Sequence, residues 1–214
     1  MIKINAEDLA RVCKNAMMFV NPKSLWLPGE VLFDLTNNTL SVYACDDYFA
    51  ICATARFTGN ADTYFVLKLE DVKTLEEFSR KNKKDEVQVS INKNGVTFAT
   101  GDEEKVFSLG EYREDNWFIV EGLIYSDEIT PATIHSFDSN PERYAKLSQL
   151  KYDKNKDWIK WKFFETATGN LLIRFTVGPD ISGVIRPLTE PERHINKETD
   201  DGDVTEEASI SLPD

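Results

Sequence analysis

The stretch EVLFDLTNNTLSVYACDDYFAICATARF, residues 30–57, contains three apolar runs separated by two short polar breaks. Each run has the length and the β-branched and aromatic content of a β-strand. Asn37-Asn38 and Asp46-Asp47 lie at the breaks, and these residue types favour turns because their side chains bond the neighbouring backbone. Residues 30–57 therefore predict three consecutive antiparallel strands.

The paired carboxylates of Asp46 and Asp47 have two other readings, a metal site or an acid/base pair beside an apolar core. Either site would need further ligands that converge on the two carboxylates. The neighbouring sequence contains no such ligands. We therefore interpret the pair as the turn between the second and third strands, where Asp can bond free backbone N–H groups.

The same order of elements occurs three times along the chain. Residues 2–4 predict a strand before residues 30–57, and Asn5 predicts the N-cap of a helix that "NPK" at 21–23 ends. The second copy spans 63–112, with a strand, a helix at 70–82, a turn at Asn94-Gly95 and three strands. The third copy has a strand at 132–138, a helix at 140–150 and strands at 158–167, 171–178 and 181–188. Ser139 and Glu142 form a capping-box pattern before its helix.

A repeat of strand, helix and three antiparallel strands predicts an α+β fold, with the helices packed on one face of the sheets. We expect two units in a domain at 1–112 and a second, truncated domain at 113–189. Residues 113–131 fit the repeat poorly and are interpreted as a connector with at most one strand. Residues 190–214 contain few large apolar residues and are predicted to be a disordered acidic tail.

Composition excludes several classes of protein. The net charge is −12. Nine acidic and two basic residues give the tail −7, which leaves −5 for the body and argues against uniform attraction to nucleic acid. No run approaches the roughly 20 apolar residues that span a bilayer, and the start lacks a secretory signal pattern, so we predict a cytoplasmic protein without membrane contact. Cys13, Cys45 and Cys52 form no close pair and are predicted to be buried, reduced thiols.

Catalytic motifs are missing from the sequence. No nucleophile elbow, zinc-protease motif, phosphate-binding glycine loop or dinucleotide fingerprint occurs. The two histidines are His135, in a predicted strand, and His194, in the tail. We therefore predict that the protein is not an enzyme and has no cofactor.

Three stretches carry a resemblance to the DNA sliding clamp family, above all to the bacterial DNA polymerase III beta subunit. They are residues 35–51, residues 86–112, and the last unit with its helix at 140–150 and final strand at 181–188. The resemblance implies a processivity factor: a homo-oligomeric ring around double-stranded DNA that tethers a DNA polymerase and is loaded by a clamp loader. Bacterial clamps have six units per chain and this chain has three, so a ring needs another subunit number, as in a short phage clamp, or a fourth unit within the connector.

In that family the helices face the DNA. The cations on the outer faces of the predicted helices are Arg11, Lys14, Lys73, Arg80, Lys81, Lys83, Lys84, Arg143, Lys146 and Lys151. They are candidates for sequence-independent phosphate contacts. The plain structural alternative is a solvated helix face whose cations near the C-terminal end favour the helix dipole.

A partner peptide would bind near the final strand, as the resemblance implies. The matching positions are Val184, Ile185, Pro187 and Leu188, and Arg186 stands where the family has a methionine. Ordinary core packing is the alternative for Val184 and Ile185. The end of the tail, ASISLPD at 208–214, is similar to peptides that clamps bind, through Ile210, Ser211 and Leu212.

A second function stays open beside the processivity factor. A clamp-derived interaction module, or an acidic DNA mimic, could modulate a host clamp without encircling DNA. The mass of the native assembly separates the two functions, because a ring requires a closed oligomer.

Overall fold

The computed structural model describes residues 1–24, 27–101, 103–126, 130–132, 141–152, 158–166 and 169–187. The first unit comprises strand β1 (Ile2–Asn5), helix α1 (Ala6–Met17) and strands β2 (Glu30–Thr36), β3 (Thr39–Cys45) and β4 (Phe49–Thr58). The second comprises β5 (Thr63–Lys68), α2 (Leu69–Lys81), β6 (Glu86–Asn92), β7 (Gly95–Thr100) and β8 (Glu103–Phe107). The predicted order of strand, helix and three strands is confirmed for both units.

The third unit comprises β9 (Thr130–Pro131), α4 (Pro141–Leu147), β10 (Ile159–Glu165), β11 (Leu171–Val177) and β12 (Ile181–Ile185). Its helix and its three final strands are confirmed. Most of the opening strand predicted at 132–138 lies outside the described residues, as do His135, Ser139 and the tail with His194.

The predicted connector contains the short strand β9, but also a helix that was not predicted, α3 (Glu114–Tyr125). Trp117, Val120 and Ile124 recur at helical spacing and are buried. Phe118 and Ile119 are exposed and apolar, so apolar side chains also occur on the outer face of the helix and its helical period is hidden in the sequence. A search for a polar face therefore overlooks this helix.

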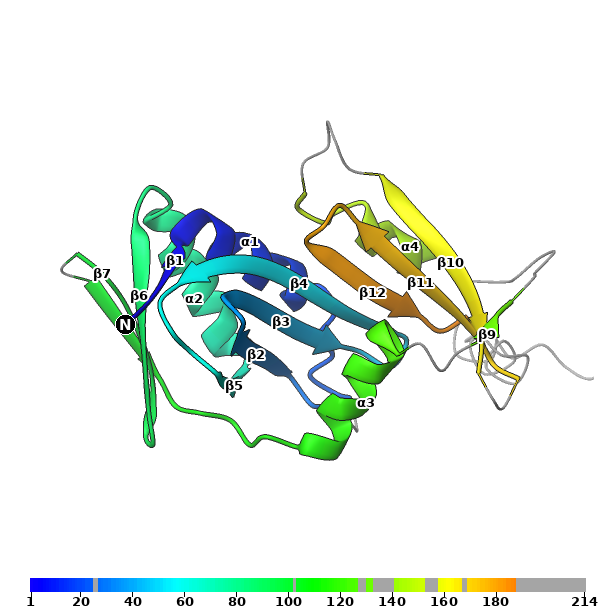
Figure 1. Cartoon of the computed structure of the whole chain (residues 1–214), viewed down its shortest axis with the longest axis horizontal. Coiled ribbons are helices and arrows are strands. Elements are labelled where there is room, and N and C mark those ends of the chain that lie inside the picture. The colour runs from blue at the N-terminus through cyan, green and yellow to red at the C-terminus, as the bar shows by residue number, and fades with distance from the viewer. Residues whose placement is uncertain are drawn as a thin grey trace, which may run out of the picture.

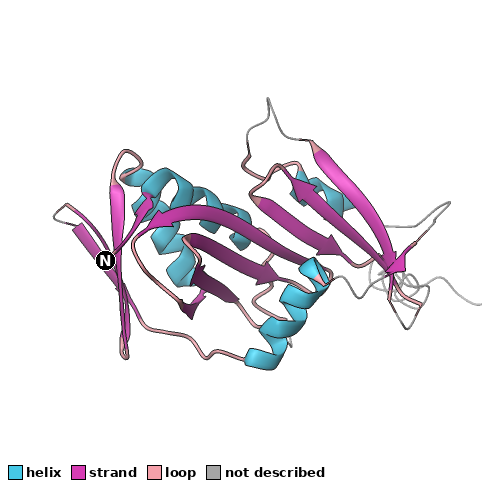
Figure 2. Cartoon of the chain, viewed as in Figure 1, coloured by secondary structure: helices cyan, strands magenta, loops and turns pink. Residues whose placement is uncertain are grey.

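Strand β4 joins the third unit to the first two (Figure 2). Along one edge it pairs with β3; along the other, β12 pairs with residues 49–53 and β1 pairs with Phe57 and Thr58. The strand order is β8-β7-β6-β1-β4-β12-β11-β10-β9, and β3, β2 and β5 continue from the other edge of β4. The sheet of the third unit is thus a continuation of the sheet of the first.

The helices cover two faces of this sheet (Figure 1). Residues of α1, α2 and α4 share one apolar cluster with Phe33 and Phe175. Trp117 of α3 belongs to a second cluster with Leu32 and Val184. Because successive strand residues point to opposite faces, Leu32 and Phe33 separate the two clusters. The prediction that helices pack on one face is confirmed for α1, α2 and α4, whereas α3 covers the other face.

Local signals agree with the predicted boundaries in most places. The Asn5 side chain accepts hydrogen bonds from the N–H groups of Glu7 and Asp8, which confirms the N-cap. Asn37 and Asn38 have φ of 52° and 59°, as a tight hairpin turn requires. Among the described helices, none is long and apolar enough to cross a membrane.

The second hairpin turn is shifted by one residue from the predicted Asn94-Gly95. Gly95 is the first residue of β7 and pairs with Asn92, so Lys93 and Asn94 make the turn. The Asn92 side chain accepts a hydrogen bond from the N–H of Asn94 at 2.8 Å. A Cβ on Gly95 would lie 2.5 Å from the Phe107 carbonyl oxygen, so this glycine allows β8 to approach closely.

Candidate functional site

A pocket of about 380 Å³ lies where α3 meets the β3–β4 turn and the strands of the third unit. Ile119, Val120 and Leu123 of α3 form one wall. The opposite wall contains Leu172 of β11 and Val184 of β12. The remaining lining residues are Ser24, Arg186 and residues 45–50. Its mainly apolar lining and its size are those of sites that take up a few side chains of a partner.

Asp46 makes the turn beside this pocket. Its Oδ1 accepts hydrogen bonds from the N–H groups of Tyr48 and Phe49, both at 2.8 Å, and its Oδ2 lies 2.7 Å from Nζ of Lys146. Asp47 accepts a hydrogen bond from Nδ2 of Asn21 at 2.9 Å. The interpretation of the pair as a turn is confirmed. In the part of the chain that the structure describes, no group of three or more His, Cys, Asp or Glu residues is placed to hold a metal.

The Asp46–Lys146 pair also ties the third unit to the first. Lys146 belongs to α4, and its Nζ lies 5.8 Å and 5.6 Å from the ring centroids of Phe19 and Phe49. The Asp46 side chain is only 9% exposed, so the ion pair is shielded from water on one side. No local sequence pattern predicts this contact, because the two residues are 100 positions apart.

The predicted peptide-binding residues divide between the pocket and the core. Val184 lines the pocket, whereas Ile185 is fully buried in the cluster beneath α1, α2 and α4. Pro187 is buried and is not among the lining residues, and Leu188 lies outside the described residues. Arg186 does line the pocket, and its backbone N–H donates to the Tyr48 carbonyl at 2.8 Å.

The wall formed by α3 was missed by the sequence analysis. Its only signal was the apolar run that contains Ile119 and Leu123. Arg174 of β11 fixes the C-terminal end of α3, with Nε donating to the Leu123 carbonyl at 2.9 Å and Nη2 to the Gly122 carbonyl at 3.3 Å. A cation at this end of a helix satisfies free carbonyls and favours the helix dipole.

The three cysteines are free and buried, as predicted. Cys45 lines the pocket, and burial raises the pKa of its thiol to about 12. Burial also raises the pKa of Cys52 to about 11 and moves that of Cys13 upward. Because the thiolate is the reactive form of cysteine, these side chains act as small apolar groups at neutral pH.

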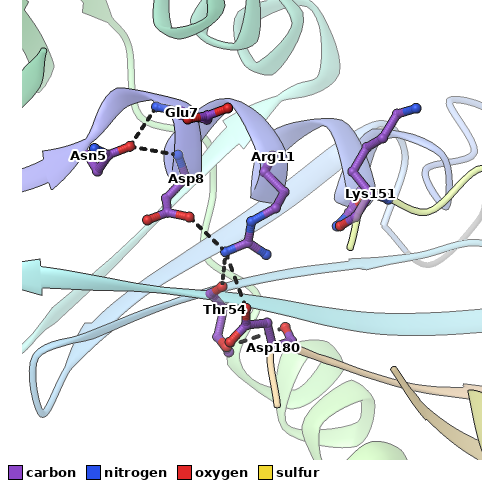
Figure 3. Close-up of polar contacts among 8 residues, drawn as sticks. Asn5, Glu7, Asp8, Arg11, Thr54, Lys151 and Asp180 are labelled. Atoms are coloured by element: carbon purple, nitrogen blue, oxygen red, sulfur yellow. Dashed lines mark hydrogen bonds and ion pairs between the residues drawn. The ribbon is translucent and has the colours of Figure 1, made fainter. Parts of the chain in front are cut away.

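Four of the ten predicted DNA-contacting cations are engaged within the protein. Arg11 donates from Nη2 to Asp8 Oδ1 and to the Thr54 carbonyl, both at 3.1 Å, and lies 3.6 Å from Asp180 (Figure 3). Arg11 therefore links α1 to β4 and to the β11–β12 turn. The other three engaged cations are Lys146 with Asp46, Arg80 with Glu76 at 3.3 Å, and Lys81 with Glu103 at 2.7 Å.

Five of the six remaining predicted cations are described, and all five are exposed. Those that are exposed and have no described ion-pair partner are Lys14, Lys73, Lys83, Lys84 and Lys151. The Arg143 side chain lies outside the described residues. Exposed acids, Glu7 of α1 and Glu70 and Glu77 of α2, alternate with these lysines. The outer helix face therefore carries both signs of charge.

No protein-family model matches the sequence, and no curated protein is similar to it in sequence. Solved structures do match the fold. The DNA polymerase sliding clamp of Bacillus subtilis has a TM-score of 0.64 at 13% identity, over 88% of this chain and 64% of that chain. The chain has the fold of a DNA sliding clamp. A Pseudomonas aeruginosa sliding clamp bound to griselimycin matches the clamp fold with a TM-score of 0.63 at 9% identity, over 88% and 65% of the two chains.

The clamp fold is also that of the DNA polymerase beta subunit of Streptococcus pyogenes, with a TM-score of 0.60 at 10% identity, over 88% and 64% of the two chains. The chain thus spans about two thirds of the length of these clamps. At such low identity the match establishes the fold alone. The predicted α+β, clamp-like fold is confirmed.

Proposed function

We propose that this protein is a non-enzymatic processivity factor of the sliding-clamp type, which holds duplex DNA and tethers a DNA polymerase and a clamp loader. The clamp fold, matched over about 88% of the chain, is the observation that carries this proposal. In this scheme residues 1–112 are a complete two-unit domain, residues 113–189 are a shortened second domain, and residues 190–214 are an acidic tail.

The face covered by α1, α2 and α4 would line the duplex. Its exposed lysines, among them Lys14, Lys73 and Lys83, supply the point charges that sequence-independent phosphate contacts need. The four engaged cations would contribute to DNA binding indirectly, because their ion pairs hold in place the elements that carry the exposed lysines. These cations are Arg11, Arg80, Lys81 and Lys146.

A ring would form by head-to-tail association of several copies. Strands β8 and β9 stand at opposite ends of the strand order in the described chain. Pairing the β8 end of one copy with the β9 end of the next is a heterologous interface, which closes into a ring if the rotation per subunit divides a full turn.

The pocket beside α3 would receive the peptide that tethers a replication protein. Ile119, Leu123, Leu172 and Val184 would bury its apolar side chains, and Arg186 would bind an acidic or carbonyl group at the rim. The site proposed for a partner peptide thus keeps Val184 from the sequence prediction and gains residues of α3.

Native mass determination, with and without circular DNA, tests the proposal. We expect a closed oligomer that co-elutes with a nicked plasmid once a clamp loader and ATP are supplied, and that is released when the plasmid is linearised. Release on linearisation distinguishes a ring from electrostatic adsorption, since adsorbed protein stays on linear DNA at the same salt concentration. A monomer that does not associate with DNA at low salt would overturn the processivity function.

A second candidate is a clamp-derived module that modulates a host clamp without encircling DNA, or that acts as an acidic DNA mimic. The internal pairing of four of the ten predicted cations and the exposed acids between the others favour it. It predicts a monomer in the mass measurement and a complex with a full-length bacterial clamp.

A further inference from the structure

A second pocket, of about 220 Å³, lies on the other flank of α3. It is bounded by β2, β3, β5 and the N-terminal half of α3, whereas the first pocket lies toward the third unit. Its lining combines aromatic rings with carboxylates. The rings that matter here belong to Tyr64, Tyr112 and Trp117, and the carboxylates belong to Asp34, Glu114 and Glu121.

Among the described residues, no cation is paired with any of these three carboxylates. None of them lies within 4.0 Å of a Lys, Arg or His nitrogen among the described residues. Arg113, adjacent in sequence to Glu114, pairs instead with Glu30 and Glu111, at 3.8 Å and 3.6 Å. This contrasts with Asp46 and Glu76, which each pair with a described cation. The pocket therefore holds uncompensated negative charge.

The rings add a surface that attracts cations. Tyr64 and Tyr112 have ring centroids 4.1 Å apart, and Tyr64 is 54% exposed, so the aromatic surface is open to solvent. Burial first, and then Tyr64, Glu114 and Glu121, raise the pKa of Tyr112, so its ring stays neutral. The electron-rich faces of such rings attract guanidinium and ammonium groups.

Trp117 gives an independent sign that a ligand is missing. Only 2% of this residue is exposed, and its Nε1–H donates to no acceptor among the described residues. A buried donor without an acceptor costs free energy and calls for an explanation such as a bound group. A simple cation satisfies the carboxylates and leaves this donor unpaired, whereas an amino-acid residue brings both a cation and a carbonyl oxygen.

We propose that this pocket binds an arginine side chain of a partner protein. The planar guanidinium stacks on the ring of Tyr64 or Tyr112 and donates to Asp34, Glu114 and Glu121. A carbonyl of the same peptide accepts from Trp117 Nε1–H, which binding must first uncover because this atom is buried in the free protein. Arginine fits better than lysine because its five donors and flat face suit several carboxylates beside an aromatic ring. The inference stands on the pocket alone and is independent of any contact with DNA.

The test titrates the 15N-labelled full-length protein with N-acetyl-arginine-N-methylamide and with its uncharged citrulline analogue. The readout is the indole N–H signal of Trp117, assigned by its loss in Trp117→Phe. We expect the arginine probe to shift this signal and to bind at least fivefold more tightly than the citrulline probe. Equal shifts with the two probes, or a Trp117 signal that does not move, would overturn the proposal.

Matched variants show which carboxylates bind the arginine probe. Glu114 and Glu121 are exposed on α3, so Glu114→Gln and Glu121→Gln preserve the fold, and each should weaken arginine binding by about two- to fivefold. The control is Glu104→Gln on β8, which removes one exposed carboxylate away from the pocket. An equal loss of affinity in the control would overturn the assignment, because it would show an effect of net charge alone.

Discussion

Gly183 occupies the place where β12 passes between β11 and β4. A Cβ there would lie 2.4 Å from Cζ of Phe175 and 2.8 Å from the Ala50 carbonyl oxygen. Because both neighbours belong to packed strands, Gly183→Ala should lower the free energy of unfolding by about 1–3 kcal/mol, the usual cost of overpacking. Urea denaturation followed by circular dichroism measures this change.

Gly122 provides the matched control for that substitution. Its Cβ would meet no atom within 4 Å, and the residue lies inside α3. Since alanine favours a helix over glycine by about 1 kcal/mol, Gly122→Ala should leave the protein as stable or more stable. A similar loss in the two variants would show that the close contacts at Gly183 are not the cause.

Glu30 makes the free energy of unfolding depend on pH. The residue is 3% exposed and its Oε2 has no described hydrogen-bond partner. Burial raises the pKa of Glu30, and Arg113 and Lys68 oppose that rise only in part. The folded protein therefore holds the proton more tightly than the unfolded chain, so Glu30 costs stability as pH rises from the ordinary carboxyl pKa through the raised one.

Glu30→Gln should accordingly be more stable than the parent protein at pH 7, and this advantage should shrink as pH falls from the raised pKa of Glu30 toward the ordinary carboxyl pKa of about 4.3. Thermal unfolding of the two proteins from pH 4 to pH 8 measures the difference. An advantage that grows toward low pH would mean that the ionised carboxylate, through Arg113, stabilises the fold.

Single residues were predictable from sequence where the cause is local. Asn5 caps α1 and Asn37-Asn38 turns a hairpin because each side chain or backbone preference acts within three residues. The pairing of Asp46 with Lys146 depends on folding across 100 positions, which no local pattern encodes. For the same reason the engagement of Arg11 with Asp180 was not foreseen.

At the scale of elements, a buried amide joins α1 to the segment that follows α4. Asn15 is fully buried, and its side chain accepts from the Lys151 N–H at 2.8 Å and donates to the Lys151 carbonyl at 3.1 Å. Asn15→Ala leaves both backbone groups unpaired and should cost about 2–3 kcal/mol. Hydrogen exchange should show faster opening at the end of α4 and in β10.

Asn92→Ala is the control, because the hydrogen bond described for the Asn92 side chain is accepted from the exposed N–H of Asn94. Water can replace that bond, so the loss should stay below about 1 kcal/mol. If Asn15→Ala and Asn92→Ala lower the free energy of unfolding equally, the bond between α1 and the segment after α4 does not hold the third unit to the first.

Strands were easier to predict than the helix that forms the pocket. Val87, Val89 and Ile91 alternate with polar residues, and their strand, β6, begins at the predicted residue. In α3 the run of Trp117, Phe118, Ile119 and Val120 mixes buried and exposed apolar side chains, so no amphipathic period remains. The candidate pocket was therefore predicted on its strand side, at Val184, and missed on its helix side.

At the scale of the whole molecule, the charge of the body opposes DNA binding except on the helix face. The net charge outside the tail is −5, so the overall charge of the protein repels duplex DNA. Binding to DNA must therefore depend on the exposed lysines of the helix face. The DNA-binding function can therefore be tested by substituting a few of these lysines and measuring how DNA affinity depends on salt concentration.

The variant Lys14→Gln/Lys73→Gln/Lys83→Gln/Lys84→Gln removes four exposed cations that have no described ion-pair partner, while the four engaged cations stay in place. If these lysines contact phosphates, DNA affinity should fall, and the slope of log affinity against log salt should become shallower by about 0.9 for each phosphate that the variant no longer neutralises. Fluorescence anisotropy with a labelled duplex, from 25 to about 200 mM salt, a range in which screening changes strongly, measures both.

Lys160→Gln/Lys162→Gln is the control for that variant. These lysines are exposed on β10 and alternate with Ile159 and Phe163, which pack toward the cluster beneath α1, α2 and α4, so they point to the opposite face of the sheet. Their substitution should leave the salt slope unchanged. An unchanged slope in the helix variant, or an equal change in the control, would remove α1 and α2 from the DNA interface and favour the module that acts without encircling DNA.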